Sequence, residues 1–63
     1  MKTTPKHYKI YPDDRPMEYV VDIYDPTDEM QLIERRCVQL SELSETIREF
    51  AQLGYVVDSV TLE

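Results

Sequence analysis

The sequence predicts an α+β fold: a small antiparallel or mixed sheet of three to four strands, with one helix packed on one face. Two segments near the N-terminus alternate apolar and polar residues, which is typical of half-buried strands. Helical spacing of apolar residues follows between Ser41 and Gly54, and a β-rich segment comes directly after that glycine. The predicted order is β-β-(β)-α-β, in which the bracketed strand is the element that the pattern leaves open.

The length of the chain allows one domain. Its 63 residues include 41% hydrophobic residues, with five Tyr and one Phe, which is typical of a folded protein and not of a disordered one. A chain of this size buries only about 60% of the surface that its unfolded form exposes, so its core must be thin. We predict a flexible N-terminus over residues 1–6 and a single α+β domain over residues 7–63.

The first two strands are expected to form a hairpin. Tyr8 and Ile10 share one face of the first strand, which covers residues 7–11. Residues 12–16 are rich in Pro and Asp and favour a turn. The second strand covers residues 17–24. Its predicted core face carries Met17, Tyr19, Val21 and Ile23.

Residues 27–38 fit either a strand or a helix. Asp25 could cap a helix that has Pro26 at its first position. The same residues could instead form a turn into a third strand over residues 30–39. We favour the strand, because a hairpin alone makes a poor sheet.

The helix is the clearest element of the sequence. We predict it over about residues 42–53, with Ser41 as its N-cap. Gly54 is the only glycine and is expected to end the helix in a left-handed conformation, with Tyr55 folding back towards Phe50. The apolar face consists of Leu43, Ile47, Phe50 and Leu53.

The last strand is predicted over residues 55–62. Its spacing places Val56, Val60 and Leu62 on one face, interrupted by Asp58.

Charge restricts the class of partner. Thirteen acidic and seven basic residues give a net charge of −6, and the three lysines in the first ten residues leave −9 on the remainder. Such a body is repelled by nucleic acid and by anionic membranes. We therefore expect a protein partner with a basic surface, no direct nucleic-acid contact and no membrane contact. A single cysteine and the absence of a signal-peptide pattern predict a cytoplasmic protein.

No group of residues has the pattern of a catalytic, cofactor or metal site. His7 is the only histidine and is expected to be an exposed strand residue, while Cys37 is expected to be a small buried residue. One glycine cannot build a glycine-rich phosphate loop. The acidic turn at Asp25 lacks the glycine of a calcium loop. The sequence therefore predicts a non-enzymatic protein without a cofactor.

Binding is expected on the acids and on the tyrosines that lie opposite the core face. An exposed tyrosine beside acids is typical of an interface. Acids spaced along a hairpin could imitate a run of phosphates and occupy a basic groove built for nucleic acid, which would inhibit the protein that owns the groove. The predicted partner-binding residues are Tyr11, Asp13, Asp14, Glu18, Asp22, Tyr24, Asp25, Asp28 and Glu29.

In size, acidity and element order, the chain resembles small modulators made by phages and other mobile elements, such as anti-CRISPR proteins and inhibitors of host RNA polymerase. It is also similar in outline to small accessory subunits of bacterial RNA polymerase. These resemblances include no shared motif, and they imply a modulator or inhibitor. The alternative is a small structural subunit that self-associates, as a homodimer for example, or docks through a sheet edge. Partner, oligomeric state and strand order stay open.

Overall fold

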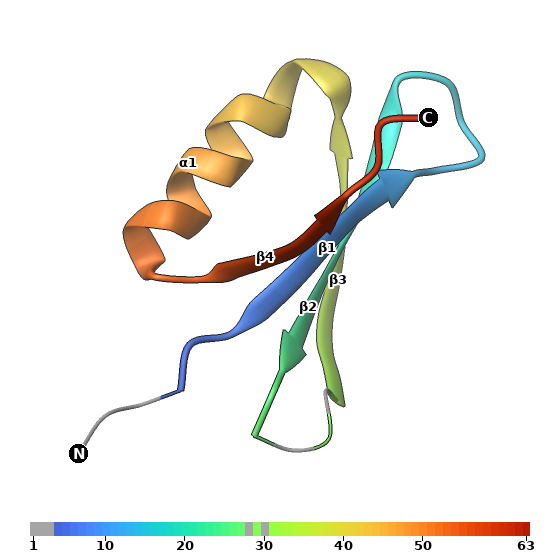
Figure 1. The fold of residues 1–63 in the computed structure, drawn as a ribbon. Helices are drawn as coiled ribbons and strands as arrows, with labels where there is room; N and C mark the ends of the chain where they lie inside the picture. Colours follow the sequence, from blue (N-terminus) through green and yellow to red (C-terminus); the bar gives the residue numbers. More distant parts are fainter. Residues whose placement is uncertain (1–3, 28, 30) are drawn as a thin grey trace.

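Four strands and one helix are found in the computed structural model, which describes residues 4–27, 29 and 31–63 (Figure 1). The elements are β1 (His7–Pro12), β2 (Glu18–Asp25), β3 (Gln31–Gln39), the 3₁₀ turn η1 (Leu40–Glu42), α1 (Leu43–Leu53) and β4 (Val56–Val60). The sheet order is β3-β2-β1-β4, with β4 parallel to β1 and the other neighbours antiparallel. The predicted α+β fold is confirmed, and its sheet is mixed.

Some of the sequence predictions concern residues that the structure does not describe. They are residues 1–3 of the expected flexible N-terminus, the predicted binding residue Asp28, and Met30 at the start of the predicted third strand. Among the residues that are described, no helix is long and apolar enough to cross a membrane.

The hairpin forms as its alternation predicts. Tyr8 pairs with Ile23 and Ile10 pairs with Val21 across β1 and β2. All four side chains are buried on the face that α1 covers, because residues paired across two strands project from the same face. The core consists of Tyr8, Ile10, Val21, Ile23, Leu43 and Phe50, with Tyr19, Val38 and Tyr55 packed against it.

The segment that the sequence left open is a strand. β3 pairs with β2 along its length and lies at one edge of the sheet. Asp25 does not cap a helix; its Oδ1 accepts hydrogen bonds from the backbone N–H of Thr27 at 2.9 Å and from the Thr27 hydroxyl at 2.6 Å. This local turn leads the chain from β2 towards β3.

The helix begins differently from the prediction. Ser41 is not the N-cap, because the chain first makes the 3₁₀ turn η1 and α1 starts at Leu43 with Glu42 as its N-cap. Glu42 reaches back, and its Oε1 accepts a hydrogen bond from the backbone N–H of Gln39 at 3.0 Å. That contact is half of a capping box. The acid that closes this turn is therefore Glu42, and Ser41 lies within the turn.

The end of α1 is as predicted. Gly54 has φ +81°, and the Tyr55 N–H donates to the Phe50 carbonyl at 2.9 Å. The rings of Tyr55 and Phe50 stack with 5.2 Å between centroids. Helix α1 then gives way to β4, having crossed one face of the sheet from β3 at one edge to β4 at the other (Figure 1). Leu43 and Phe50 are buried, whereas the other two residues of the predicted apolar face, Ile47 and Leu53, are exposed.

The face assignment predicted for the last strand is wrong. Tyr8 pairs with Val57 and Lys9 pairs with Ser59, so Asp58 is an extra residue in a β-bulge. The bulge shifts the alternation, and Val57 joins Val60 on the helix-covered side while Val56 pairs with His7. Every residue of β4 is exposed, which follows from its place at the sheet edge.

Candidate protein-binding surfaces

The predicted acidic side of the hairpin is not one surface. Asp13 and Asp14 lie in the β1–β2 connection, and Glu18 begins β2, whereas Asp25 ends β2 and Glu29 lies in the next loop. At about 3.3 Å per residue, the two ends of an eight-residue strand are roughly 23 Å apart. The acids therefore form two separate clusters at opposite ends of the sheet.

Asp22, which was expected to link these clusters, is buried. Only 2% of the residue is exposed, because it lies on a central strand between side chains of β1 and β3. Its carboxylate accepts hydrogen bonds from Arg35 Nε at 2.7 Å, from Arg35 Nη2 at 3.1 Å and from the Tyr11 hydroxyl at 2.7 Å. Hydrogen bonding to Arg35 holds the pKa of Asp22 below its ordinary value. The expectation that this carboxylate is exposed is wrong.

The face of the sheet opposite α1 carries the two tyrosines. Tyr11 and Tyr24 are both half-buried, as the alternation of the strands predicts. The Lys9 ammonium lies 5.2 Å from the centroid of the Tyr24 ring. Hydrogen bonding to Asp22 raises the pKa of Tyr11, because the carboxylate stabilises the protonated phenol. The Tyr11 hydroxyl and the Lys9 ammonium therefore already have partners within the sheet.

The residues that could have carried covalent chemistry are separated. His7 Nδ1 lies 2.7 Å from Asp58 Oδ1, on the same side of the sheet as Tyr11. Cys37 is on β3, level with Val20, and is exposed; it was expected to be buried. It is exposed because β3 is an edge strand and α1 covers the other face. Two strand spacings, each about 4.8 Å, lie between β1 and β3, so His7 does not reach the thiol.

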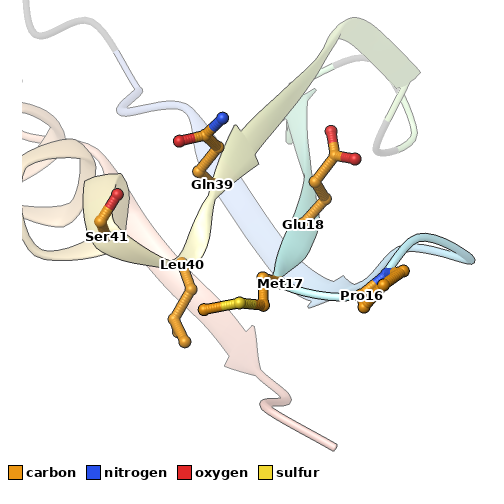
Figure 2. A pocket seen from close by; sticks show the side chains of 6 residues that line it. All are labelled: Pro16, Met17, Glu18, Gln39, Leu40 and Ser41. Carbon is orange, nitrogen blue, oxygen red and sulfur yellow. The ribbon is translucent and has the colours of Figure 1, made fainter.

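A hollow with a mixed apolar and polar lining lies where the start of β2 meets the start of η1. Its volume is about 350 Å³, and it is lined by Pro16, Met17, Glu18, Gln39, Leu40 and Ser41. Figure 2 shows the side chains of Met17 and Leu40 close to one another, with Glu18 and Gln39 pointing the other way. The Leu40 N–H donates to the Met17 carbonyl at 2.8 Å, which ties the start of η1 to the start of β2.

Met17 departs from the sequence prediction. It was assigned to the core face of β2, but 69% of it is exposed and its φ is +63°. β2 begins one residue later, at Glu18, so Met17 belongs to the turn. The available signal was the run of Pro and Asp residues that ends at Pro16, directly before it.

Hydrogen bonds link Glu18, which lines the hollow, to the acids of the preceding connection. We call Asp13, Asp14 and Glu18 the acidic rim. The Asp13 N–H donates to the Glu18 carbonyl at 3.0 Å, and Asp13 Oδ1 accepts from the Asp14 N–H at 2.7 Å. Arg15 approaches Glu18 at 3.9 Å and is the one cation in this connection. The rim therefore keeps a net negative charge next to the exposed apolar side chains of Met17 and Leu40.

The described residues contain no group of three or more His, Cys, Asp or Glu side chains arranged to hold a metal ion. A second hollow, of about 430 Å³, is lined by Thr4, Pro5, Lys6, Leu53, Gly54 and Tyr55. The chain matches no protein-family model, no curated protein and no solved structure.

Proposed function

We propose that this chain is a non-enzymatic protein-binding domain, and that it docks through the hollow and the acidic rim at the β1–β2 end of the sheet. The partner is a protein with a basic surface that also presents an apolar side chain. The observation that carries the proposal is Met17, an exposed apolar residue held at φ +63° beside Leu40.

The conformation of Met17 supports a role beyond stability. A non-glycine residue in the left-handed region costs roughly 1–2 kcal/mol. Such strain is expected where a side chain must be presented in a fixed place. Leu40, the neighbour of Met17, is itself 42% exposed. Two exposed apolar side chains beside a hollow provide a pocket into which a partner residue can fit.

The surrounding charges favour a basic partner. Interfaces commonly combine an apolar centre with a polar rim. Glu18 lines the hollow itself, and Asp13 and Asp14 belong to the connection that precedes it. The chain carries a net charge of −6, so a basic surface would be attracted from a distance and then held at the rim. The partner's apolar side chain would fill the hollow while its Lys or Arg residues contact Asp13 and Asp14.

Imitation of a run of phosphates receives less support. That arrangement needs acids along the whole hairpin, but Asp22 is buried against Arg35 and leaves the middle of the run without exposed negative charge. The proposal is therefore confined to one end of the sheet. If the partner handles nucleic acid, inhibition would follow from contact with a single basic patch.

Affinity capture with matched variants tests this proposal. Met17→Ser and Leu40→Ser alter the hollow, and the double variant Asp13→Asn/Asp14→Asn removes charge from the rim. Leu53→Ser is the apolar control, and Glu45→Gln/Glu49→Gln on α1 is the control for equal loss of charge; all three residues are exposed. Each tagged variant is incubated with lysate of the native host, and retained proteins are quantified at low and high salt.

We expect one retained protein that is lost with both the hollow variants and the rim variant, but not with either control. The hollow variants should weaken its binding by roughly thirtyfold, which corresponds to the ~2 kcal/mol of an interface hot spot. High salt should weaken it as well, since exposed charges are screened over about 10 Å at 0.1 M. Equal retention by the hollow variants and the controls would refute the proposal.

A further inference from the structure

The outer edge of β4 has unpaired backbone groups at two valines. Val56 donates its N–H to the Lys6 carbonyl at 2.8 Å, and Thr61 donates its N–H to the Ile10 carbonyl at 2.8 Å. Successive peptide groups of an extended strand point in opposite directions. Because Val56 and Thr61 face β1, the N–H and C=O groups of their neighbours Val57 and Val60 point away from the sheet.

The side chains of the same two valines extend the core to the sheet edge. Val57 pairs with Tyr8 and Val60 pairs with Ile10, and both of these β1 partners are buried. Val57 is 48% exposed and Val60 is 43% exposed, because no further strand lies beyond β4 in the described sheet. A fifth strand would cover both valines and bond to both sets of backbone groups at once.

The two edges of the sheet differ in their charge. β3, at the other edge, carries Glu34, Arg35 and Arg36 in succession, and charges of this kind discourage strand addition. Asp58 is the only ionisable residue of β4. It lies on the opposite face from Val57 and Val60, 2.7 Å from His7. The β4 edge is therefore apolar on one face and has one carboxylate on the other.

A second copy of the chain is a poor occupant of this edge. An antiparallel pair that joins Val57 to the copy's Val60 brings the two Asp58 carboxylates within one residue of each other. Like charges opposed across strands are destabilising, and each copy carries a net charge of −6. A segment that places a cation at this position would instead gain an ion pair.

We propose that β4 accepts, by strand addition, an extended segment of another protein with the pattern apolar–basic–apolar. The two apolar residues lie over Val57 and Val60 on the helix-covered side. The basic residue between them projects to the other face and pairs with Asp58, since neighbouring side chains of a strand alternate. Backbone bonding provides affinity here, and the ion pair selects the segment.

The test uses the full 63-residue chain and two hexapeptides that differ only at one residue, one with Val-Lys-Val and one with Val-Glu-Val at its centre. Amide exchange and chemical shifts are followed by NMR at millimolar peptide. The lysine peptide should slow exchange of the Val57 and Val60 amides and leave those of β3 unchanged. It should bind roughly fivefold more tightly than the glutamate peptide, as cross-strand charge pairs contribute up to about 1 kcal/mol. Asp58→Lys should reverse this preference.

Two variants examine the backbone and apolar contributions. Val60→Pro removes an outward N–H and no bond to β1, so peptide binding should be lost while the fold is retained. Val60→Lys keeps that N–H but replaces the apolar side chain that one valine of the peptide would cover, so the lysine peptide should again fail to bind. Equal binding of both peptides, or protection of β3 in place of β4, would overturn the proposal. Protection of Val57 and Val60 that rises with protein concentration alone would also overturn it, because it would identify a second copy as the occupant.

Discussion

Asp22 and Arg35 form a two-point ion pair across β2 and β3, in which Arg35 Nε and Nη2 lie 2.7 Å and 3.1 Å from the two carboxylate oxygens. The Tyr11 hydroxyl donates to the same carboxylate from β1. Three adjacent strands are thus joined at one side chain, on the face that α1 does not cover. The Asp22 carboxylate at the centre of this group is buried, whereas the side chain of Arg35 is 58% exposed.

Asp22→Asn should destabilise the domain. The substitution removes the charge that Arg35 and Tyr11 contact, and hydrogen bonds to charged groups contribute about 1.5–3 kcal/mol. We expect the free energy of unfolding, measured by urea denaturation, to fall by an amount in that range. Glu34→Gln is the control, because Glu34 is exposed and its pairing with Arg36 lies on the surface. The same change in both variants would contradict a special role for the buried carboxylate.

The stability of the domain should fall in acid. Hydrogen bonds from Arg35 lower the pKa of Asp22, and hydrogen bonds from Thr27 lower that of Asp25. A carboxyl with a lowered native pKa binds more protons in the unfolded chain, so its contribution is complete above its ordinary pKa and is lost as pH falls towards the native value. Urea denaturation between pH 7 and pH 2 should show the loss beginning below about pH 5.

Asp22→Asn provides the control for that pH profile, since it removes one of the two titrating groups. Its stability should fall less steeply in acid than that of the wild type. Parallel profiles for the two proteins would show that Asp22 has the same pKa in the native and unfolded chains.

Gly54→Ala should destabilise the domain through its backbone alone. The added Cβ would meet nothing within 4 Å, but φ is +81°. An L-residue in this conformation costs roughly 1–2 kcal/mol, and thermal denaturation would record it. D-alanine at position 54, introduced by chemical synthesis, is the control and should not destabilise. If D-alanine and L-alanine lowered the stability equally, the positive φ would not be the cause.

Met17→Gly should preserve or raise stability while weakening partner binding. Glycine relieves the strain at φ +63°, which offsets its greater freedom in the unfolded chain. Glu29→Gly is a matched control, because Glu29 also has a positive φ, of +53°, but lies at the other end of β2. Both variants should have similar denaturation midpoints, and only Met17→Gly should lose the captured partner. Loss of binding in Glu29→Gly alone would move the docking site to the opposite end.

Local patterns predicted most of the fold. Alternation placed Tyr8, Ile10, Val21 and Ile23 in the core, since a strand with one covered face must put its apolar residues there. Gly54 marked the end of the helix because a left-handed residue was needed. The third strand was predicted because a hairpin alone makes a poor sheet, and it is confirmed over residues 31–39.

The errors come from contacts between distant residues. Alternation places Asp22 opposite the core face but cannot show that Arg35, 13 residues later, buries it by pairing with it. The bulge at Asp58 has no local sequence signal. The prediction therefore assigned Val56 to the face on which Val57 lies. Met17 continues the apolar alternation of β2 but lies in the turn before it, and the hollow beside Leu40 forms only when the chain returns through β3.

Site-specific photo-crosslinking in the native host would test the proposed docking site most directly. A photoreactive amino acid is introduced at position 17 in one variant and at Arg48, an exposed residue of α1, in another. Docking at the hollow predicts that position 17 forms an adduct with one protein and that Asp13→Asn/Asp14→Asn reduces this adduct. Position 48 should not form it. An adduct of equal yield at both positions, or one unaffected by loss of the rim charges, would contradict docking at the β1–β2 end.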